Sequence, residues 1–176
     1  MSNFFMLITG VSEENGMVVV SGTIERGQIA TGDKVESLGL KKRFARIVSR
    51  IKKSGNDTSE ACQGDAVELF LQKIALEDVM IGDALVISGG VVAVVEDVFE
   101  IGGKGTVAIV TLNRGILRIG ADVKFIGSHE AVSTCVLGIE MHRKIIDEAY
   151  AGDSVGVLLR YIHKNDIERG DFLLAD

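Results

Sequence analysis

The segment ACQGDAVELFL at residues 61–71 returns, 88 residues later, as AYAGDSVGVLL at residues 149–159. When the whole chain is shifted by 88 residues without a gap, 20 of 88 positions are identical, and all of these identities lie between residues 19 and 85 of the first copy. Self-similarity at a fixed period is the signature of a duplicated structural unit. We therefore predict that the chain of 176 residues consists of two related halves.

The repeated positions favour turns built on glycine. Arg26-Gly27, Gly64-Asp65 and Gly82-Asp83 return as Arg114-Gly115, Gly152-Asp153 and Gly170-Asp171. Glycine tolerates positive φ, and glycine beside aspartate is typical of tight turns. The chain has no proline, so its 21 glycines are expected to provide most of the turns.

Short apolar runs of the length of ordinary strands lie between these turns. They cover residues 6–8, 17–24, 34–38, 45–51, 66–71 and 85–87, and then 91–101, 106–113, 123–126, 132–140, 154–161 and 172–174. Helical periodicity is supported at most over residues 144–149. Six or seven short strands in each half predict a small closed β-barrel, because closure hides the sheet edges.

The predicted fold is therefore all-β, with two small closed barrels in tandem at residues 1–88 and 89–176. The boundary is expected at Ser88-Gly89-Gly90, between the last strand of the first copy and the first strand of the second. Two barrels joined by so short a linker are expected to pack against each other.

Composition narrows the class of protein. Hydrophobic residues make up 47% of the chain, which excludes a disordered protein. No apolar run reaches the roughly 18–20 residues of a membrane span, and the N-terminus lacks the basic region of a secretory signal. We expect a cytoplasmic protein with no membrane partner. Cys62 and Cys135 fall at non-equivalent positions of the repeat, so a disulfide framework is not expected.

Several motifs in the second half follow one another across residues 95–175. They are Glu96-Asp97-Val98-Phe99, Gly102-Gly103-Lys104-Gly105-Thr106-Val107, Arg114-Gly115, Gly138-Ile139-Glu140-Met141-His142-Arg143-Lys144, Ala151-Gly152-Asp153 and Ile167-Glu168-Arg169-Gly170. This series resembles the second domain of elongation factor Tu. The first half is similar to the same domain more distantly, through residues 22–27, 32–33, 64–65 and 79–83. The resemblance implies two β-barrels of the translation-factor domain 2 type.

The resemblance also implies a binding site for the aminoacylated 3′ end of transfer RNA. By this likeness, the site comprises Glu96, Asp97 and Phe99 on the aminoacyl side, Glu140 near the terminal adenosine, Arg143 close by, and Ser154 where the family usually has asparagine. An aromatic ring stacks on a base, carboxylates accept hydrogen bonds from hydroxyl or amino groups, and arginine pairs with phosphate. The alternative is that these residues persist as parts of turns and local ion pairs.

The first half lacks this set and carries a basic stretch. Residues 41–53 contain seven basic residues and no acid. A strand here would place Ala45, Ile47, Ser49 and Ile51 inward, and would turn outward Lys42, Phe44, Arg46, Val48, Arg50 and Lys52. Cations beside an aromatic ring predict contact with an RNA backbone. The alternative is a solvated face that guards against edge pairing. A net charge of -6 disfavours a surface that attracts nucleic acid everywhere, but not a local basic face.

No motif in the sequence predicts catalysis. The phosphate-binding pattern G-x-x-x-x-G-K-[ST] is absent, and Gly102-Gly103-Lys104-Gly105 is interpreted as a β-turn. His129, His142 and His163 have no partners at metal-ligand spacing, so neither a metal, a cofactor nor a catalytic residue is expected.

Together with the absence of catalytic motifs, the resemblance implies a non-enzymatic translation-related module that contacts the acceptor end of aminoacyl-tRNA or ribosomal RNA and lacks the GTPase domain. The alternative is an interaction scaffold, or the barrel part of a split elongation factor that partners a separate GTPase domain.

Overall fold

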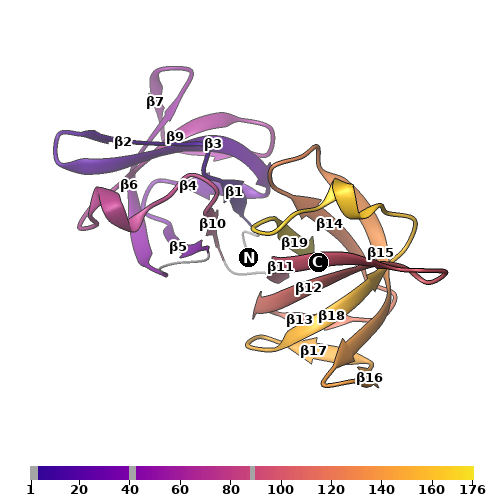
Figure 1. Ribbon diagram of the computed structural model, residues 1–176. Coiled ribbons are helices and arrows are strands. Elements are labelled where there is room, and N and C mark those ends of the chain that lie inside the picture. Colours follow the sequence, from indigo (N-terminus) through magenta and orange to yellow (C-terminus); the bar gives the residue numbers. More distant parts are fainter. Residues whose placement is uncertain (1–3, 40–42, 88–89) are drawn as a thin grey trace. The chain divides into compact units, whose positions relative to one another are not determined.

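The computed structural model describes residues 4–39, 43–87 and 90–176 (Figure 1). The chain divides into two compact units, Met1–Gly89 and Gly90–Asp176. Each unit is an antiparallel β-barrel, which confirms the fold class predicted from the sequence. No helix among the described residues is long and apolar enough to cross a membrane.

The first barrel closes through six strands in the order β1-β10-β5-β6-β9-β3, because β3 pairs back with β1. Its strands are β1 (Phe5–Leu7), β2 (Gly10–Glu14), β3 (Met17–Arg26), β4 (Gln28–Ala30), β5 (Lys34–Leu38), β6 (Ala45–Lys53), β7 (Asn56–Thr58), β8 (Glu60–Cys62), β9 (Ala66–Leu71) and β10 (Ala84–Val86). Strand β2 extends the sheet beside β3, β7 pairs with β6, and β4 and β8 form a separate pair. A 3-10 turn, η1 (Leu76–Asp78), precedes β10.

The second barrel closes in the same way, in the order β14-β19-β11-β12-β18-β15 with β15 paired to β14. Its strands are β11 (Val91–Ile101), β12 (Gly105–Arg114), β13 (Ile116–Arg118), β14 (Asp122–Ile126), β15 (Val132–Met141), β16 (Lys144–Ile146), β17 (Glu148–Tyr150), β18 (Ser154–Leu159) and β19 (Phe172–Ala175). Strand β16 extends β15, and β13 pairs with β17. The 3-10 turn η2 (Lys164–Asp166) occupies the position of η1.

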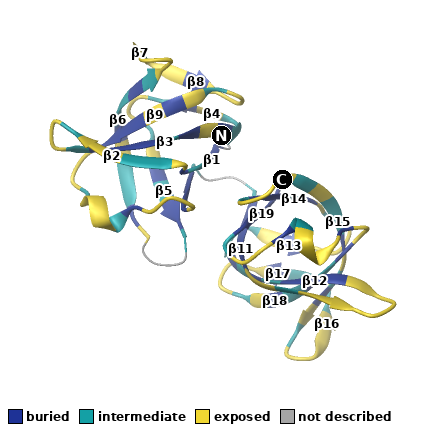
Figure 2. Ribbon diagram, turned by 45° about the horizontal axis from the view of Figure 1, so that its top comes forward, coloured by how far each residue is buried: buried dark blue, intermediate teal, exposed yellow. Residues whose placement is uncertain are grey.

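Each barrel has its own core, built from the inward side of alternating strand residues (Figure 2). In β9 the buried core residues are Val67, Leu69 and Leu71. In β18 the equivalent positions, 88 residues later, hold Val155, Val157 and Leu159. Burial of such apolar side chains is the main driving force for closing a small barrel.

Glycine followed by aspartate forms the same turn in both barrels. At Gly152-Asp153, the glycine has φ +101, the Asp153 N–H donates to the Tyr150 carbonyl (2.9 Å), and the Asp153 carboxylate accepts from the Tyr150 N–H (2.8 Å). The same pair of bonds forms at Asp33, Asp65, Asp83 and Asp171. The turns predicted from the repeat are therefore confirmed, and the aspartate recurs because its carboxylate satisfies a backbone donor.

The predicted helical turn at residues 144–149 is wrong. Strands β16 and β17 occupy this segment, and Ile145 pairs with Glu140 while Ala149 pairs with Leu117. The apolar spacing that resembled a helix arises from two short strands, of which the second buries Ala149. Cys62 and Cys135 are both free thiols.

Candidate functional site

A β-bulge in β11 turns neighbouring acidic residues to the outside of the second barrel. The pairing of β11 with β12 skips Glu96, which is the extra residue between Val95 and Asp97. Val95 is buried in the core, whereas Glu96, Asp97 and Phe99 are exposed. Strict alternation would turn one of the two acids inward, so the bulge is what places all three polar or aromatic candidates on one outer face.

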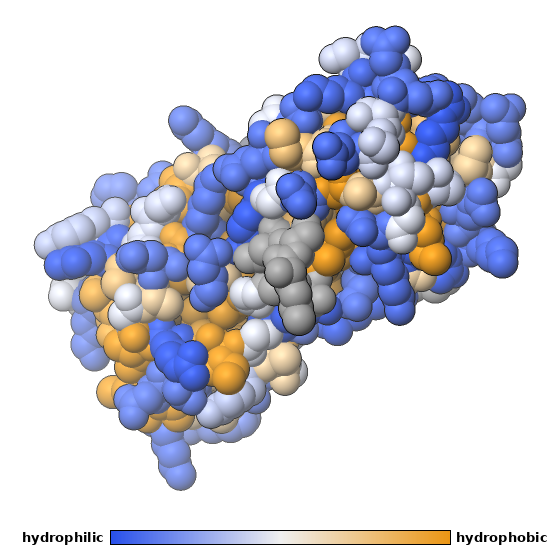
Figure 3. Space-filling view, turned by 180° about the vertical axis from the view of Figure 1, so that it is seen from behind, coloured by the Kyte–Doolittle hydropathy of each residue, from blue (hydrophilic) through white to orange (hydrophobic). Residues whose placement is uncertain are grey.

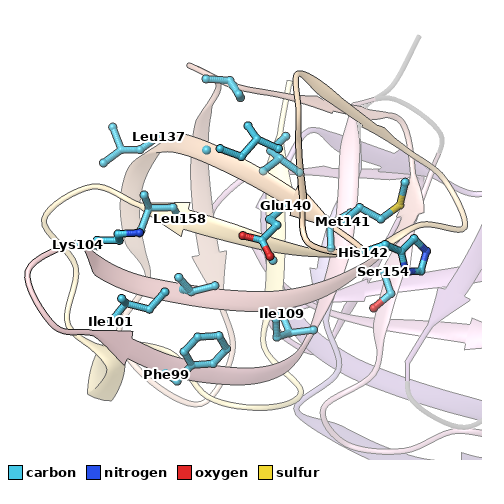
Figure 4. A pocket seen from close by; sticks show the side chains of 17 residues that line it. Phe99, Ile101, Lys104, Ile109, Leu137, Glu140, Met141, His142, Ser154 and Leu158 are labelled. Atoms are coloured by element: carbon cyan, nitrogen blue, oxygen red, sulfur yellow. The ribbon is translucent and has the colours of Figure 1, made fainter.

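The outer face of β11, β12, β18, β15 and β16 is hollowed into a groove of about 650 Å³ (Figure 4). Its described lining residues are Phe99, Ile101, Lys104, Val107, Ile109, Ile119, Leu137, Gly138, Ile139, Glu140, Met141, His142, Ile145, Ser154, Val155, Gly156 and Leu158. Most of the lining is therefore apolar, as is usual for a site that holds a small organic group.

Two glycines keep the floor of this groove open. Gly156 pairs with Ile109 on one side and with Glu140 on the other, so it lies in the middle of the sheet. A Cβ added at Gly156 would lie 3.5 Å from side-chain atoms of Ile109 and Val107, in ordinary contact. Gly138 has similar room beside Leu158. Larger side chains at these two positions would project into the groove.

Few polar groups stand in this apolar surrounding. In Figure 4 the Glu140 carboxylate lies among the lining side chains, with Lys104 on one side and His142 and Ser154 on the other. Glu140 is the only carboxylate among the described lining residues. The groove thus offers one strong acceptor at its centre, a hydroxyl at one end and a cation at the other.

The hairpin between β15 and β16 ends at the edge of the groove in a two-residue turn. Met141 pairs with Lys144, and the intervening His142 and Arg143 have φ of +52° and +65°. Two successive left-handed residues form a type I′ turn, which usually requires asparagine or glycine. The first barrel has Ser54 and Gly55 at the equivalent turn, whereas the second barrel places two basic or titratable side chains at the tip.

Three of the six residues predicted for the acceptor-end site line this groove. Phe99, Glu140 and Ser154 come from β11, β15 and β18, respectively, and the sheet register brings them together. The predicted β-turn at residues 102–105 is confirmed, but its Lys104 also lines the groove.

The other three predicted residues lie outside the lining. Glu96 accepts a hydrogen bond from the Thr111 hydroxyl (2.5 Å), and Asp97 accepts one from the Val98 N–H (2.9 Å). Arg143 is exposed at the hairpin tip. The two acids thus satisfy local donors, and Arg143 is positioned beside the groove.

Sequence reasoning missed the apolar rim. Ile101, Leu137 and Ile145 are 38%, 46% and 80% exposed, and hydrophobic atoms reach the surface of the second barrel at the left of Figure 3. Comparison of the two copies contained a signal for the groove. Gly138 and Gly156 stand where the first copy has Arg50 and Glu68, so the second copy lacks two side chains at these positions.

The equivalent face of the first barrel keeps a smaller recess of about 380 Å³ at one end, whose lining includes Lys52, Ala66 and Glu68, the residues aligned with Glu140, Ser154 and Gly156. The other end of this face is filled. Phe70, which is aligned with Leu158, is fully buried although it is not part of the barrel core. The Arg50 guanidinium and the Lys52 ammonium each lie 5.0 Å from the centre of its ring. These cation–π contacts hold the two cations against the Phe70 ring. The wide apolar groove is therefore found on the second barrel, whereas the first barrel has a smaller recess at one end of the equivalent face.

The predicted outward face of the basic strand is wrong in part. Phe44 is 9% exposed and belongs to the core, as does Val48, whereas Ile47 is 59% exposed. The reason is a β-bulge in β6 at Ser49. The extra residue reverses which side chains point inward, so the residues before Ser49 and those after it follow opposite alternations. Lys42 lies outside the described residues.

The cations at the C-terminal end of β6 are paired with carboxylates. Arg50 Nε lies 2.6 Å from Asp57 Oδ1, and Lys52 Nζ lies 3.2 Å from Glu14 Oε2. Lys53 Nζ lies 2.7 Å from Asp65 Oδ1. These ion pairs reduce the positive charge that Arg50 and Lys52 present to a polyanion.

We predict that NMR titration of the carboxyl groups will show this pairing. The hydrogen bond from Arg50 lowers the pKa of Asp57, and the Cys62 N–H followed by Lys53 lowers that of Asp65. A lowered folded-state pKa stabilises the fold above the ordinary aspartate pKa of about 3.9, and this stabilisation is lost as pH falls through the lowered value. Arg50→Gln should return only Asp57 towards the ordinary pKa; an unchanged Asp57 would contradict the pairing.

Both halves are thus six-stranded antiparallel barrels with Gly-Asp turns, and one of them carries an open groove on its outer face. The family model described as elongation factor Tu domain 2 matches residues 18–86 and 105–174. The chain therefore belongs to the elongation factor Tu domain 2 family, with one copy in each half, and is a translation-factor module.

Proposed function

We propose that this chain is a non-catalytic module of the cytoplasmic translation apparatus, and that the groove of its second barrel holds the 3′ acceptor end of aminoacyl-tRNA. The observation that carries this proposal is the convergence of Phe99, Glu140 and Ser154 in one groove, since the sheet brings them together from three strands. Any GTP hydrolysis that accompanies this binding would then be the work of a separate GTPase domain.

The chemistry of the groove suits the end of a single RNA strand. Unpaired bases are recognised by stacking on aromatic rings and by hydrogen bonds to their edges. Phe99 and the neighbouring Ile109 offer apolar surface, and Glu140 accepts hydrogen bonds from an exocyclic amine, a ribose hydroxyl or an α-ammonium group. A groove of 650 Å³ lies within the roughly 300–1,000 Å³ of small-ligand sites.

The cations around the groove suit the phosphates of the same strand. Lys104 lines one side, while Arg143 and Lys144 are exposed at the β15–β16 hairpin. Phosphate contacts position an RNA strand, and contacts to the base or the aminoacyl group then provide selectivity. This arrangement predicts binding that depends on both salt and aminoacylation.

The experiment that tests the proposal is fluorescence anisotropy of labelled transfer RNA, aminoacylated and deacylated, titrated with the protein. We expect Glu140→Gln to weaken binding of the aminoacylated form by about tenfold, or about 1.4 kcal/mol, because the negative charge is lost and one of the two accepting oxygens becomes a donor. Glu100→Gln is the matched control, since Glu100 is an exposed carboxylate of β11 outside the groove lining. Equal effects of the two substitutions would refute an acceptor-end site at Glu140.

Ribosomal RNA is an alternative ligand for the same groove, and the same titration distinguishes it from aminoacyl-tRNA. Binding that is salt-sensitive but indifferent to aminoacylation would assign the groove to another RNA strand end. The exposed Ile145 and Leu137 favour a second candidate, a protein partner such as a separate GTPase domain. Absence of RNA binding at low salt would support that candidate, because a protein interface does not depend on counterion release.

A further inference from the structure

The first barrel carries a recess that is distinct from the filled face over Phe70. It has a volume of about 490 Å³, and its described lining residues are Lys34, Ala45, Arg46, Ile47, Ser49, Gln72 and Lys73. These residues come from β5, from the first half of β6 and from the segment that follows β9. Three of the seven are cationic, and the described lining contains no carboxylate.

Arg46 is held in this recess by neutral groups. Its Nε donates to the Lys73 carbonyl (2.8 Å), and its Nη1 donates to the Ala45 carbonyl (2.7 Å). Carbonyl acceptors orient a guanidinium without cancelling its charge. The remaining N–H groups of the planar fork are thus available for an anion, and the fork geometry matches two oxygens of one phosphate.

The cations of the recess differ in their ion pairing from those at the C-terminal end of β6. Among the described residues, Lys34, Arg46 and Lys73 form no ion pair, whereas Arg50 and Lys52 are paired with Asp57 and Glu14. Positive charge that is not compensated locally concentrates the electrostatic field in a recess. A polyanion would therefore be attracted to this end of the strand.

The basic character is specific to the first copy. At positions 88 residues later, the three cations are replaced by Asp122, Thr134 and Tyr161. The backbone is nevertheless conserved between the copies, since Lys73 and Tyr161 have the same left-handed conformation, with φ of +57° and +47°. The duplicated scaffold thus presents cations at one copy and an acid, a hydroxyl and a phenol at the other.

We propose that the recess of Lys34, Arg46 and Lys73 binds the phosphodiester backbone of a single RNA strand. The described lining has no aromatic residue, the usual anchor of a protein interface, which favours a backbone ligand over a folded protein partner. Ile47, 59% exposed at the edge, offers apolar contact to a ribose or a base. This site lies on the first barrel and does not depend on the acceptor-end groove of the second.

The test uses the full chain and a labelled oligouridylate of about 12 nucleotides, a length within the usual footprint of strand-binding barrels. The variant is Lys34→Gln/Lys73→Asn, which removes two cations, keeps Arg46, and places at position 73 a residue that tolerates left-handed backbone. We expect about tenfold weaker binding at low salt, and a slope of log K against log salt reduced by about 1.4, because each single-strand phosphate contact contributes about 0.7.

The matched control is Arg50→Gln/Lys52→Gln, which removes the same charge from the same barrel. Because these cations are already paired with carboxylates, we expect the control to retain most of the affinity and of the salt slope. Equal losses in both variants would overturn the assignment in favour of general attraction. Unchanged binding by Lys34→Gln/Lys73→Asn would also overturn it. Unfolding curves of both variants verify that each barrel is folded.

Two further arms separate this site from its alternatives. An oligoglutamate peptide that binds more tightly than oligouridylate would replace RNA by an acidic protein segment as the ligand. In a Glu140→Gln background, Lys34→Gln/Lys73→Asn should cause the same fold-loss of oligouridylate binding as in the unmodified protein, so failure of the acceptor-end proposal would not affect this one. Absence of oligouridylate binding by the unmodified protein at low salt would refute the recess as an RNA site.

Discussion

Gly127→Ala is expected to destabilise the second barrel by about 3 kcal/mol, because it combines overpacking with loss of buried hydrogen bonds. A Cβ at Gly127 would lie 2.5 Å from Cγ and 3.0 Å from Cα of Asp171. Asp171 is 3% exposed, and its carboxylate accepts from the backbone N–H groups of Ser128 (3.0 Å) and Glu168 (2.9 Å). The carboxylate cannot move away from the new methyl group without breaking those bonds.

Urea unfolding followed by tyrosine fluorescence measures this effect in the second barrel. The chain has no tryptophan, and both of its tyrosines, Tyr150 and Tyr161, lie in the second unit. Gly102→Ala is the matched control, because an added Cβ there meets nothing within 4 Å. We expect the control to change stability by no more than about 0.5 kcal/mol. A Gly127→Ala protein as stable as the control would show that Asp171 is not the constraint at this turn.

Under the proposed function, Gly156→Leu is expected to weaken binding of the aminoacyl-tRNA acceptor end strongly while leaving the barrel folded. The leucine side chain would project into the groove from its floor, between the positions of Ile109 and Glu140. Glycine within a strand is less stable than alanine by roughly 0.5–1 kcal/mol, so the substitution should not weaken the fold. The expected affinity loss is about a hundredfold, or about 2.7 kcal/mol, from exclusion of the ligand.

The first barrel provides the matched control for this substitution. Glu68 is the residue aligned with Gly156, and it is exposed on β9. Glu68→Leu should leave acceptor-end binding unchanged, whereas Gly156→Leu should lose it in the same anisotropy titration. Normal binding by a folded Gly156→Leu protein would mean that the ligand does not enter this groove. Gly156→Ala, whose Cβ makes only ordinary contacts, should be intermediate.

The two barrels share the same turns and strand order but differ on their outer faces. Gly39 and Gly127 both lie against the carboxylate of an aspartate, Asp83 and Asp171, respectively. By contrast, Gly156 lies on the floor of the wide groove of the second copy, whereas Glu68 at the equivalent position lines the smaller recess of the first copy. Duplication therefore conserved the residues that form turns, while the sheet surfaces diverged towards different ligands under our proposals.

Much of the fold could be predicted because its signals are local. The Gly-Asp turns depend on four consecutive residues, and the strands on alternation within five to ten residues. The three-residue strands β4, β7, β8, β13, β16 and β17 were missed, since three residues are too few to show a pattern. Strand β2 was also missed, because its sequence GVSEE is mostly polar and contains no apolar run. The facing of Phe44 and Ile47 was wrong because the bulge at Ser49 has no signature in the side-chain pattern.

The lining of the groove was predicted in part. Phe99, Glu140 and Ser154 were identified by family likeness, and the structure places all three in the groove. The contributions of Ile109 and Gly156 were missed, because they become visible only when strands distant in sequence are placed side by side. The basic stretch was recognised, but its cations divide into a paired set and an unpaired set according to the carboxylates that the fold brings near them.

By itself, the sequence determined the duplication, the turns and the all-β class, because these follow from the identities of neighbouring residues. The tertiary structure alone decided which face of each barrel is open. A single extra residue, such as Glu96, reverses the direction of the side chains beyond it, and the depth of a groove depends on which residues meet across several strands. Such pairings are long-range, so an open groove in one copy and a buried Phe70 in the other emerged only from the folded chain.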